Sequence, residues 1–298
     1  MNKNIKYLIE NIVNFNPADY SNDELVDRDD IDDILQAPKN KDELYDIVKK
    51  RIEENRFGNE DLIYPDLSDI DISYITDLSN LFSSSFNDKK NLKLDLSTWD
   101  TSNVTNMAYM FCQCMELIEL DLSGWDTSNV TNMTHMFSTC LNLTKITGLS
   151  GFDTSKVNDM SCMFERCAEL TELDVSSFDT SNVESMYDMF GVCRLITKLD
   201  VSGFDTSKVT NMSCMFSMCE KLNELDVSGF DTSKVEKMYL LFSNCKSLTE
   251  LDMSNFDISN VIEMDRLFNG CDNLKTIKTH NITLLREFHA SKLPKPSN

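Results

Sequence analysis

The chain contains little glycine, proline or histidine, and its positive charges are outnumbered by negative ones. Only 8 Gly and 5 Pro occur in 298 residues, which excludes collagen-like and flexible low-complexity material. Lys and Arg number 28 against 50 Asp and Glu, a net charge of −22, so binding to nucleic acid or anionic membranes is not expected. No apolar run approaches the ~18 residues of a transmembrane helix. Glu10, Asn11 and Asn14 interrupt any signal-peptide core, so no export signal is expected.

An internal repeat explains the abundance of Met, Phe and Cys. The triplet Asp-Thr-Ser or Asp-Ile-Ser recurs along the chain at intervals of mostly 26 residues, starting at Asp71, Asp100, Asp126, Asp153, Asp179, Asp205, Asp231 and Asp257. A Phe follows each triplet start after 11 residues, and in every unit but the first a Cys lies three residues beyond that Phe. Eight units therefore run from about residue 62 to residue 277.

Each unit combines two hydrophobic periods. The stretch LIELDLSGW places Leu117, Leu120 and Leu122 on one side, which is the strand pattern of leucine-rich repeats. The next stretch places apolar residues at offsets 0, 3, 6, 7 and 10, as on one face of a short helix that Ser128 would cap, and these residues are Val130, Met133, Met136, Phe137 and Cys140. We therefore predict an α/β leucine-rich-repeat solenoid of about eight 26-residue strand-turn-helix units. Its strands should lie side by side in parallel, one per coil, around Leu120, Leu173, Leu199, Leu225 and Leu251.

The repeat motif itself resembles a known family. The pattern M-F-x-x-C-x-x-L-x-x-L-D-[VL]-S-x-[FW]-D-T-S-[NK]-V is similar to the BspA-like leucine-rich repeats of bacterial surface proteins, which also occur in proteins encoded by phages of gut bacteria. The resemblance spans residues 62–277. It implies a binding or adhesion role, and it assigns no individual site residue.

The two ends of the chain differ from the repeats. Residues 1–61 contain one helical stripe at Ile5, Leu8, Ile9 and Ile12, a weaker third helical pattern over residues 21–36, and a second clear stripe at Leu44, Ile47, Val48 and Ile52. This segment is expected to form a small helical N-terminal cap on the solenoid, or alternatively to dock the solenoid to something larger. Residues 278–298 are expected to form a C-terminal cap and a basic tail.

No catalytic constellation is recognisable. Three His residues are present, at positions 135, 280 and 289, and none belongs to a known motif, so the protein is not expected to be an enzyme or to need a cofactor. The Cys column from Cys114 to Cys271 is expected to be a ladder of buried thiols, with Cys162 and Cys214 on an outer face. Metal binding is not expected, because the Cys112–Cys114 pair lacks a partner pair.

Carboxylates line the outward face of the predicted strands. Lys alternates with Glu in one column, but in the adjacent coils near the C-terminus both outward positions are acidic. We take these side chains as a candidate partner-binding patch that Lys198 partly offsets, comprising Asp200, Glu224, Asp226, Glu250 and Asp252. The alternative is that these carboxylates accept hydrogen bonds from turn amides and serve the fold.

The expected function is non-catalytic protein–protein interaction, in adhesion or recognition. A basic protein partner would suit the acidic patch, whereas nucleic acid would not. The alternative is a structural or accessory component, associated with a phage or a cell and anchored by its N-terminal segment. Localisation stays open, because the missing export signal and ten Cys favour a cytoplasmic or phage-associated protein while the resemblance favours the cell surface. The partner's identity and the oligomeric state also stay open.

Overall fold

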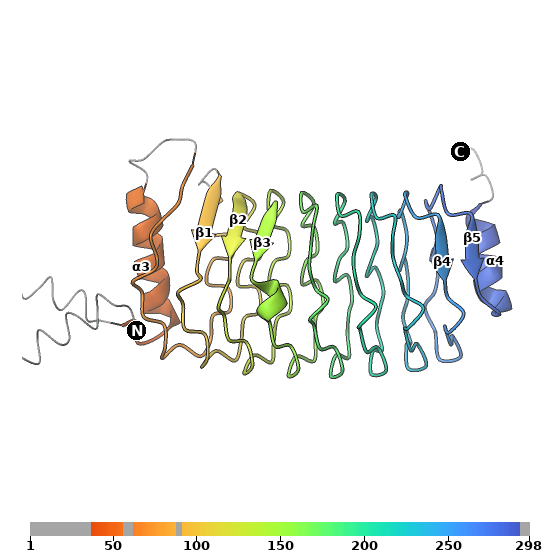
Figure 1. The fold of residues 1–298 in the computed structure, drawn as a ribbon, viewed down its shortest axis with the longest axis horizontal. Coiled ribbons are helices and arrows are strands. Elements are labelled where there is room, and N and C mark those ends of the chain that lie inside the picture. The colour runs from red at the N-terminus through yellow and green to blue at the C-terminus, as the bar shows by residue number, and fades with distance from the viewer. Residues whose placement is uncertain (1–36, 56–61, 88–90, 293–298) are drawn as a thin grey trace, which may run out of the picture.

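The repeat units wind into coils that stack in a row between two terminal helices, α3 (Lys41–Glu54) and α4 (Ile282–Ser291) (Figure 1). The structure is a computed structural model, and it describes residues 37–55, 62–87 and 91–292. The predicted N-terminal stripe at Ile5–Ile12 and the pattern over residues 21–36 lie outside the described residues. No helix in the described part of the chain is long and apolar enough to cross a membrane.

One side of the stack carries the predicted parallel strands. Strands β1 (Leu92–Asp95), β2 (Leu117–Asp121) and β3 (Lys145–Thr147) form one parallel sheet, and β4 (Glu250–Asp252) pairs in parallel with β5 (Thr276–Lys278). Parallel pairing is thus confirmed around Leu120 and Leu251. The coils between the two sheets are extended on this side without regular strands, apart from a parallel bridge between Lys198 and Glu224.

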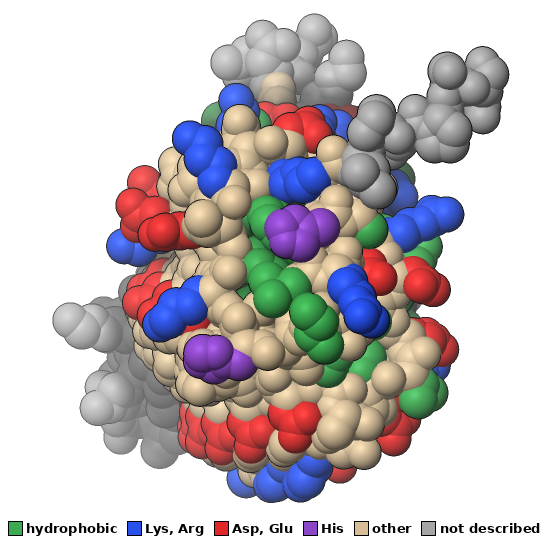
Figure 2. All heavy atoms as spheres, turned by 90° about the vertical axis from the view of Figure 1, so that its right-hand side faces the viewer, with side chains coloured by type: hydrophobic (Ala, Val, Ile, Leu, Met, Phe, Trp, Pro, Cys, Tyr) green, Lys and Arg blue, Asp and Glu red, His purple; other side chains and the backbone are tan. Residues whose placement is uncertain are grey.

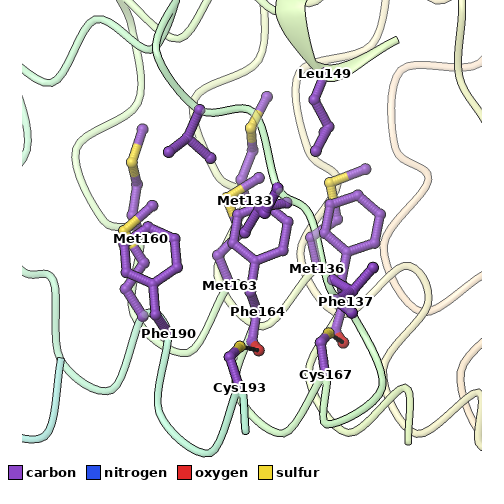
Figure 3. Close-up of a cluster of buried hydrophobic side chains, with 14 of the residues drawn as sticks. Met133, Met136, Phe137, Leu149, Met160, Met163, Phe164, Cys167, Phe190 and Cys193 are labelled. Carbon is purple, nitrogen blue, oxygen red and sulfur yellow. Dashed lines mark hydrogen bonds between the residues drawn. The ribbon is translucent and has the colours of Figure 1, made fainter. Parts of the chain in front are cut away.

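The core consists of stacked ladders of identical positions. The repeat Phe rings stack from coil to coil with centroids 5.1–6.1 Å apart, and Figure 3 shows three of them with the neighbouring Met side chains. A second aromatic ladder follows the strands, where Trp125, Phe152 and Phe178 stack at 6.3 and 6.5 Å. The Met positions expected inside are fully buried, among them Met107, Met133 and Met212. Every coil therefore buries its apolar face against its neighbours.

The prediction of a short helix in each unit is wrong. Among the described residues, the stretches around the repeat Phe contain no α-helix and form consecutive turns instead. In the second unit, the amides of Met107, Tyr109 and Phe111 donate to carbonyls of the next coil, while those of Met110 and Cys112 donate three residues back. The turn therefore uses half of its amides to join neighbouring coils, whereas a helix would use them internally. Ser128 accordingly caps no helix, and its amide donates to Asp126 Oδ1 at 3.0 Å.

This ladder of turns requires left-handed backbone at two positions in each coil. The residues two before and two after the repeat Phe have φ between 53° and 76°, and only the last of these, Gly270, is a glycine. Tyr109 and Gln113 flank Phe111 in this way, and Cys162 and Arg166 flank Phe164. Left-handed backbone is unfavourable for residues with a Cβ, so the coil-to-coil hydrogen bonds must more than offset that cost.

The column cysteines are buried as predicted. Each thiol donates to the carbonyl oxygen of the repeat Phe in the preceding coil, at Sγ···O distances of 2.9–3.2 Å (Figure 3). The expectation that Cys162 and Cys214 lie on an outer face is wrong in part, because Cys162 is only 4 % exposed and Cys214 is half-buried. Their predicted outer position depended on a helix that the structure does not contain.

Two helices lie against the ends of the coil stack. The stripe predicted in residues 41–54 is confirmed as α3, which Asn40 caps and which buries Leu44, Val48 and Ile52 in the same core as the coils. At the other end α4 buries Leu284 and Phe288, and the ring of Phe288 meets that of Phe268 edge-on at 5.9 Å.

Candidate functional site

The strand side of the last four coils is hollowed. A cavity of about 600 Å³ opens there, lined by side chains from four successive coils. All five side chains of the predicted acidic patch line it, namely Asp200, Glu224, Asp226, Glu250 and Asp252. Figure 2, which views the stack from the α4 end, shows Asp and Glu side chains in rows along its flank. We call this cavity and its lining the acidic groove.

Strand alternation explains how the acidic groove forms. In each coil the leucine of the L-D pair faces the core, so the residues on either side of it face outward. Leu199 and Leu251 are only 2 % exposed, whereas Glu224, Asp226 and Glu250 are exposed. Because the repeat is 26 residues long at this end of the chain, outward positions of neighbouring coils lie next to one another.

Two lysines form ion pairs with carboxylates of the acidic groove. Lys198 Nζ lies 3.3 Å from Glu224 Oε2, and Lys278 Nζ lies 2.7 Å from Asp252 Oδ2. The alternation of Lys and Glu in the sequence predicts the first pair. The second was not predicted, because Lys278 was expected to lie in the C-terminal cap and basic tail. In the structure Lys278 belongs to β5, and its register places it opposite Asp252.

Three carboxylates of the acidic groove have no direct ion pair among the described residues. Neither Asp226 nor Glu250 forms an ion pair with any residue that the structure describes. Asp200 lies near Lys198 without a direct ion pair. The acidic groove therefore contains two carboxylates in ion pairs, those of Glu224 and Asp252, and three without a direct ion pair in the described part of the chain.

The three aspartates also serve the local backbone. Oδ1 of each accepts hydrogen bonds from both the amide and the hydroxyl of the Ser two residues later, at 2.5–3.1 Å. These hydrogen bonds, from Ser202 and Ser228, hold the pKa of Asp200 and Asp226 below its usual value. Lys278 and then Ser254 lower the pKa of Asp252 to about 2. All three aspartates are therefore ionised at neutral pH. Their hydrogen bonds also brace the turns, which was the alternative interpretation of these carboxylates.

A second group of polar side chains lies around the repeat Phe positions. The donor atoms of His135, Cys162 and Glu165 are all within 4.8 Å of one another. No motif along the chain predicts this cluster, because its three residues come from two adjacent repeat units. The signal was present in the columns: His135 and Cys162 share one position in adjacent units, two residues before the repeat Phe.

Sequence comparison assigns the repeats to a family. Four overlapping stretches, residues 53–148, 113–199, 142–225 and 193–290, match the family described as "Mycoplasma protein of unknown function, DUF285". Together these stretches cover well over half of the chain. The chain belongs to the DUF285 family. The family matches the chain in four overlapping stretches, which agrees with the repeated coils. The finer BspA-like resemblance stays a prediction.

Solved structures include leucine-rich repeat proteins that are similar to this DUF285 chain. The crystal structure of the T. pallidum leucine-rich repeat protein TpLRR has 15% sequence identity and a TM-score of 0.33, over 68% of this chain and 83% of that one. The crystal structure of a TLR13–ssRNA13 complex has 14% identity and a TM-score of 0.24, over 69% of this chain and 34% of that one. TM-scores this low do not support any functional inference. No curated protein matches the DUF285 chain.

Proposed function

We propose that this protein is a non-catalytic interaction protein whose acidic groove binds a basic segment of a partner protein. The observation that carries the proposal is the convergence of five carboxylates from three coils in one cavity of about 600 Å³. Cavities of roughly 300–1,000 Å³ hold compact ligands or short segments, so the groove suits one or a few side chains of a partner. The adhesion role implied by the BspA-like resemblance belongs to the same proposal.

Charge distribution favours a cationic guest. Asp226 and Glu250 have no countercharge among the described residues, and Glu224 and Asp252 could exchange their lysines for Lys or Arg of a partner. Complementary charge mainly raises the association rate and selects against wrong partners. Nucleic acid would be repelled, because its phosphates would meet these carboxylates.

The three aspartates of the acidic groove are poorly suited to act as general acids. A general acid needs a pKa raised towards the working pH, whereas the pKa values of Asp200, Asp226 and Asp252 are lowered. The groove also contains no histidine, cysteine or tyrosine in its lining. These features support binding without chemistry.

The test uses one charge removal inside the acidic groove and one outside it. Glu250→Gln removes an exposed carboxylate that has no ion pair within the described chain, so folding should be unaffected. Glu172→Gln is the matched control, because Glu172 occupies the same column three coils earlier, is also exposed and lies outside the groove lining. The probe is a labelled octalysine peptide, with an octaglutamate peptide as the charge control.

We expect octalysine to bind the wild-type protein and the Glu172→Gln variant at similar rates, measured by stopped-flow fluorescence at low ionic strength. Glu250→Gln should slow association several-fold, with a weaker dependence on salt. Equal rates for the two variants, or no binding of octalysine to the wild type, would contradict the proposal.

A further inference from the structure

The cluster of His135, Cys162 and Glu165 lies away from the acidic groove, beside the repeat Phe ladder. His135 precedes Phe137 by two residues, Cys162 precedes Phe164 by two, and Glu165 follows Phe164 directly. One imidazole nitrogen, one sulfur and one carboxylate oxygen lie within 4.8 Å of one another. None of the three lines the acidic groove.

Neighbouring side chains hold these donors in place. The ring of Tyr109 stacks on that of His135 with centroids 4.6 Å apart and planes tilted by 11°. Glu165 accepts a hydrogen bond from Ser138 Oγ at 2.7 Å on one oxygen and pairs with Arg166 Nε at 3.0 Å on the other. Each carboxylate oxygen keeps a further lone pair, so these contacts orient Glu165 and leave it able to bind a cation.

An unpaired carboxylate adjoins the cluster from the next coil. Asp188 occupies the position equivalent to Cys162, and its charge acts on both Cys162 and Glu165. Among the described residues, no hydrogen bond or ion pair reaches its carboxylate, although the residue is half-buried. It lies over Gly191, where any Cβ would collide with it. Burial and the charge of Glu165 raise the pKa of Asp188, and a bound cation nearby would favour its ionised form.

We propose that His135, Cys162 and Glu165 bind one divalent transition-metal cation of the zinc class. Nitrogen, thiolate and carboxylate donors together are typical of zinc, whereas calcium and magnesium take oxygen donors. Zinc–ligand bonds of about 2.0–2.3 Å place tetrahedral ligands roughly 3.5 Å apart, so the side chains need to close by about 1 Å. Binding releases the Cys162 proton to solvent as the metal–sulfur bond forms. The positive charge of the bound cation then acts on the carboxylate of Asp188.

The experiment titrates Co²⁺ into the reduced, metal-free full-length protein and then displaces it with Zn²⁺. We expect one Co²⁺ per chain with a thiolate-to-cobalt charge-transfer absorption band, and loss of that band as Zn²⁺ replaces it. Cys162→Ser should abolish the band. His135→Asn, which suits left-handed backbone, and Glu165→Gln should weaken Co²⁺ binding by at least about tenfold.

The matched control is Cys214→Ser. Cys214 lies in the same column as Cys162, two coils further on and half-buried, and it is outside the cluster. Its variant should keep the band and the stoichiometry. Absence of the band in the wild type, or a band that survives in Cys162→Ser, overturns the proposal. If Cys162→Ser fails to fold, unchanged Co²⁺ affinity in both His135→Asn and Glu165→Gln overturns it equally.

Discussion

Each residue of the Asp-Thr-Ser triplet has a distinct task in joining the coils. The Asp carboxylate accepts the amide of the Ser two residues on, at 2.9–3.1 Å. The Thr is buried, and its hydroxyl donates to the Asp carbonyl of the next coil at 2.8–3.0 Å in the six successive units from Thr101 to Thr232. The Asp therefore shapes the turn and the Thr fixes its distance to the following turn. This division of tasks explains why the triplet repeats with so little variation.

Thiol reactivity tests the burial of the cysteine ladder. In the native, reduced protein, a thiol reagent should label Cys214 first, because it is the most exposed cysteine. Burial and the nearby Asp188 raise the pKa of Cys214 to about 11, so even this reaction should be slower than that of a free thiol. Peptide mass spectrometry over time gives the order. Rapid labelling of any column cysteine from Cys114 to Cys271 would contradict the burial described here.

At the scale of the element, the turn ladder replaces the helix that the apolar spacing suggested. Offsets of 0, 3, 6, 7 and 10 bury the same side chains in a helix and in a chain of three-residue turns. The two differ in where the amides donate, and a one-dimensional pattern of apolar residues does not record that. The repeat length and the buried columns were therefore predictable, whereas the backbone between Val130 and Cys140 was not.

The sites were predictable to a different extent. The repeat length alone predicts that the five carboxylates of the acidic groove lie together, as the structure shows. It does not predict the pairing of Lys278 with Asp252, which depends on β5 continuing the stack beyond the last full unit. In the His135–Cys162–Glu165 cluster, His135 and Cys162 share one column, Glu165 belongs to another, and the three come from two adjacent coils. Their proximity depends on the three-dimensional path of the turn, which the sequence pattern does not give.

The left-handed positions of the turn ladder give a test by glycine substitution. Gln113 is exposed with φ of 59°, so Gln113→Gly should raise the free energy of unfolding by about 1 kcal/mol, through relief of left-handed strain. Glu169→Gly is the control. Glu169 is exposed in a turn two coils further along the stack, and its φ is not positive. That change should lower the free energy of unfolding by roughly 0.5–1 kcal/mol, through chain entropy. Urea unfolding measures both, and a loss in Gln113→Gly would contradict the left-handed turn.

At the scale of the whole molecule, the aspartates couple the stability of the solenoid to pH. Hydrogen bonds from serine lower the pKa of turn aspartates along the full length of the stack, including Asp66, Asp100, Asp126, Asp153, Asp205, Asp226 and Asp231. A carboxylate with a lowered pKa in the folded state stabilises that state above its unfolded pKa of 3.8 and loses this contribution as pH falls through the folded value.

We therefore expect the thermal midpoint to be nearly constant from neutral pH down to about pH 4 and to fall between about pH 4 and pH 2. Calorimetry across the pH series measures the midpoint. A midpoint that stays constant or rises below about pH 4 would show that the serine–aspartate hydrogen bonds contribute little.

Under the proposed function, the acidic groove is the surface of the solenoid that binds a basic segment. Hydrogen–deuterium exchange with and without saturating octalysine tests it most directly, because it reports the location of binding along the chain. We predict slower exchange in peptides that contain residues 198–202, 223–226 and 249–252, with little change around the repeat Phe turns of the same coils. Protection confined to other parts of the stack, or spread evenly over all acidic coils including that of Glu172, would contradict the account.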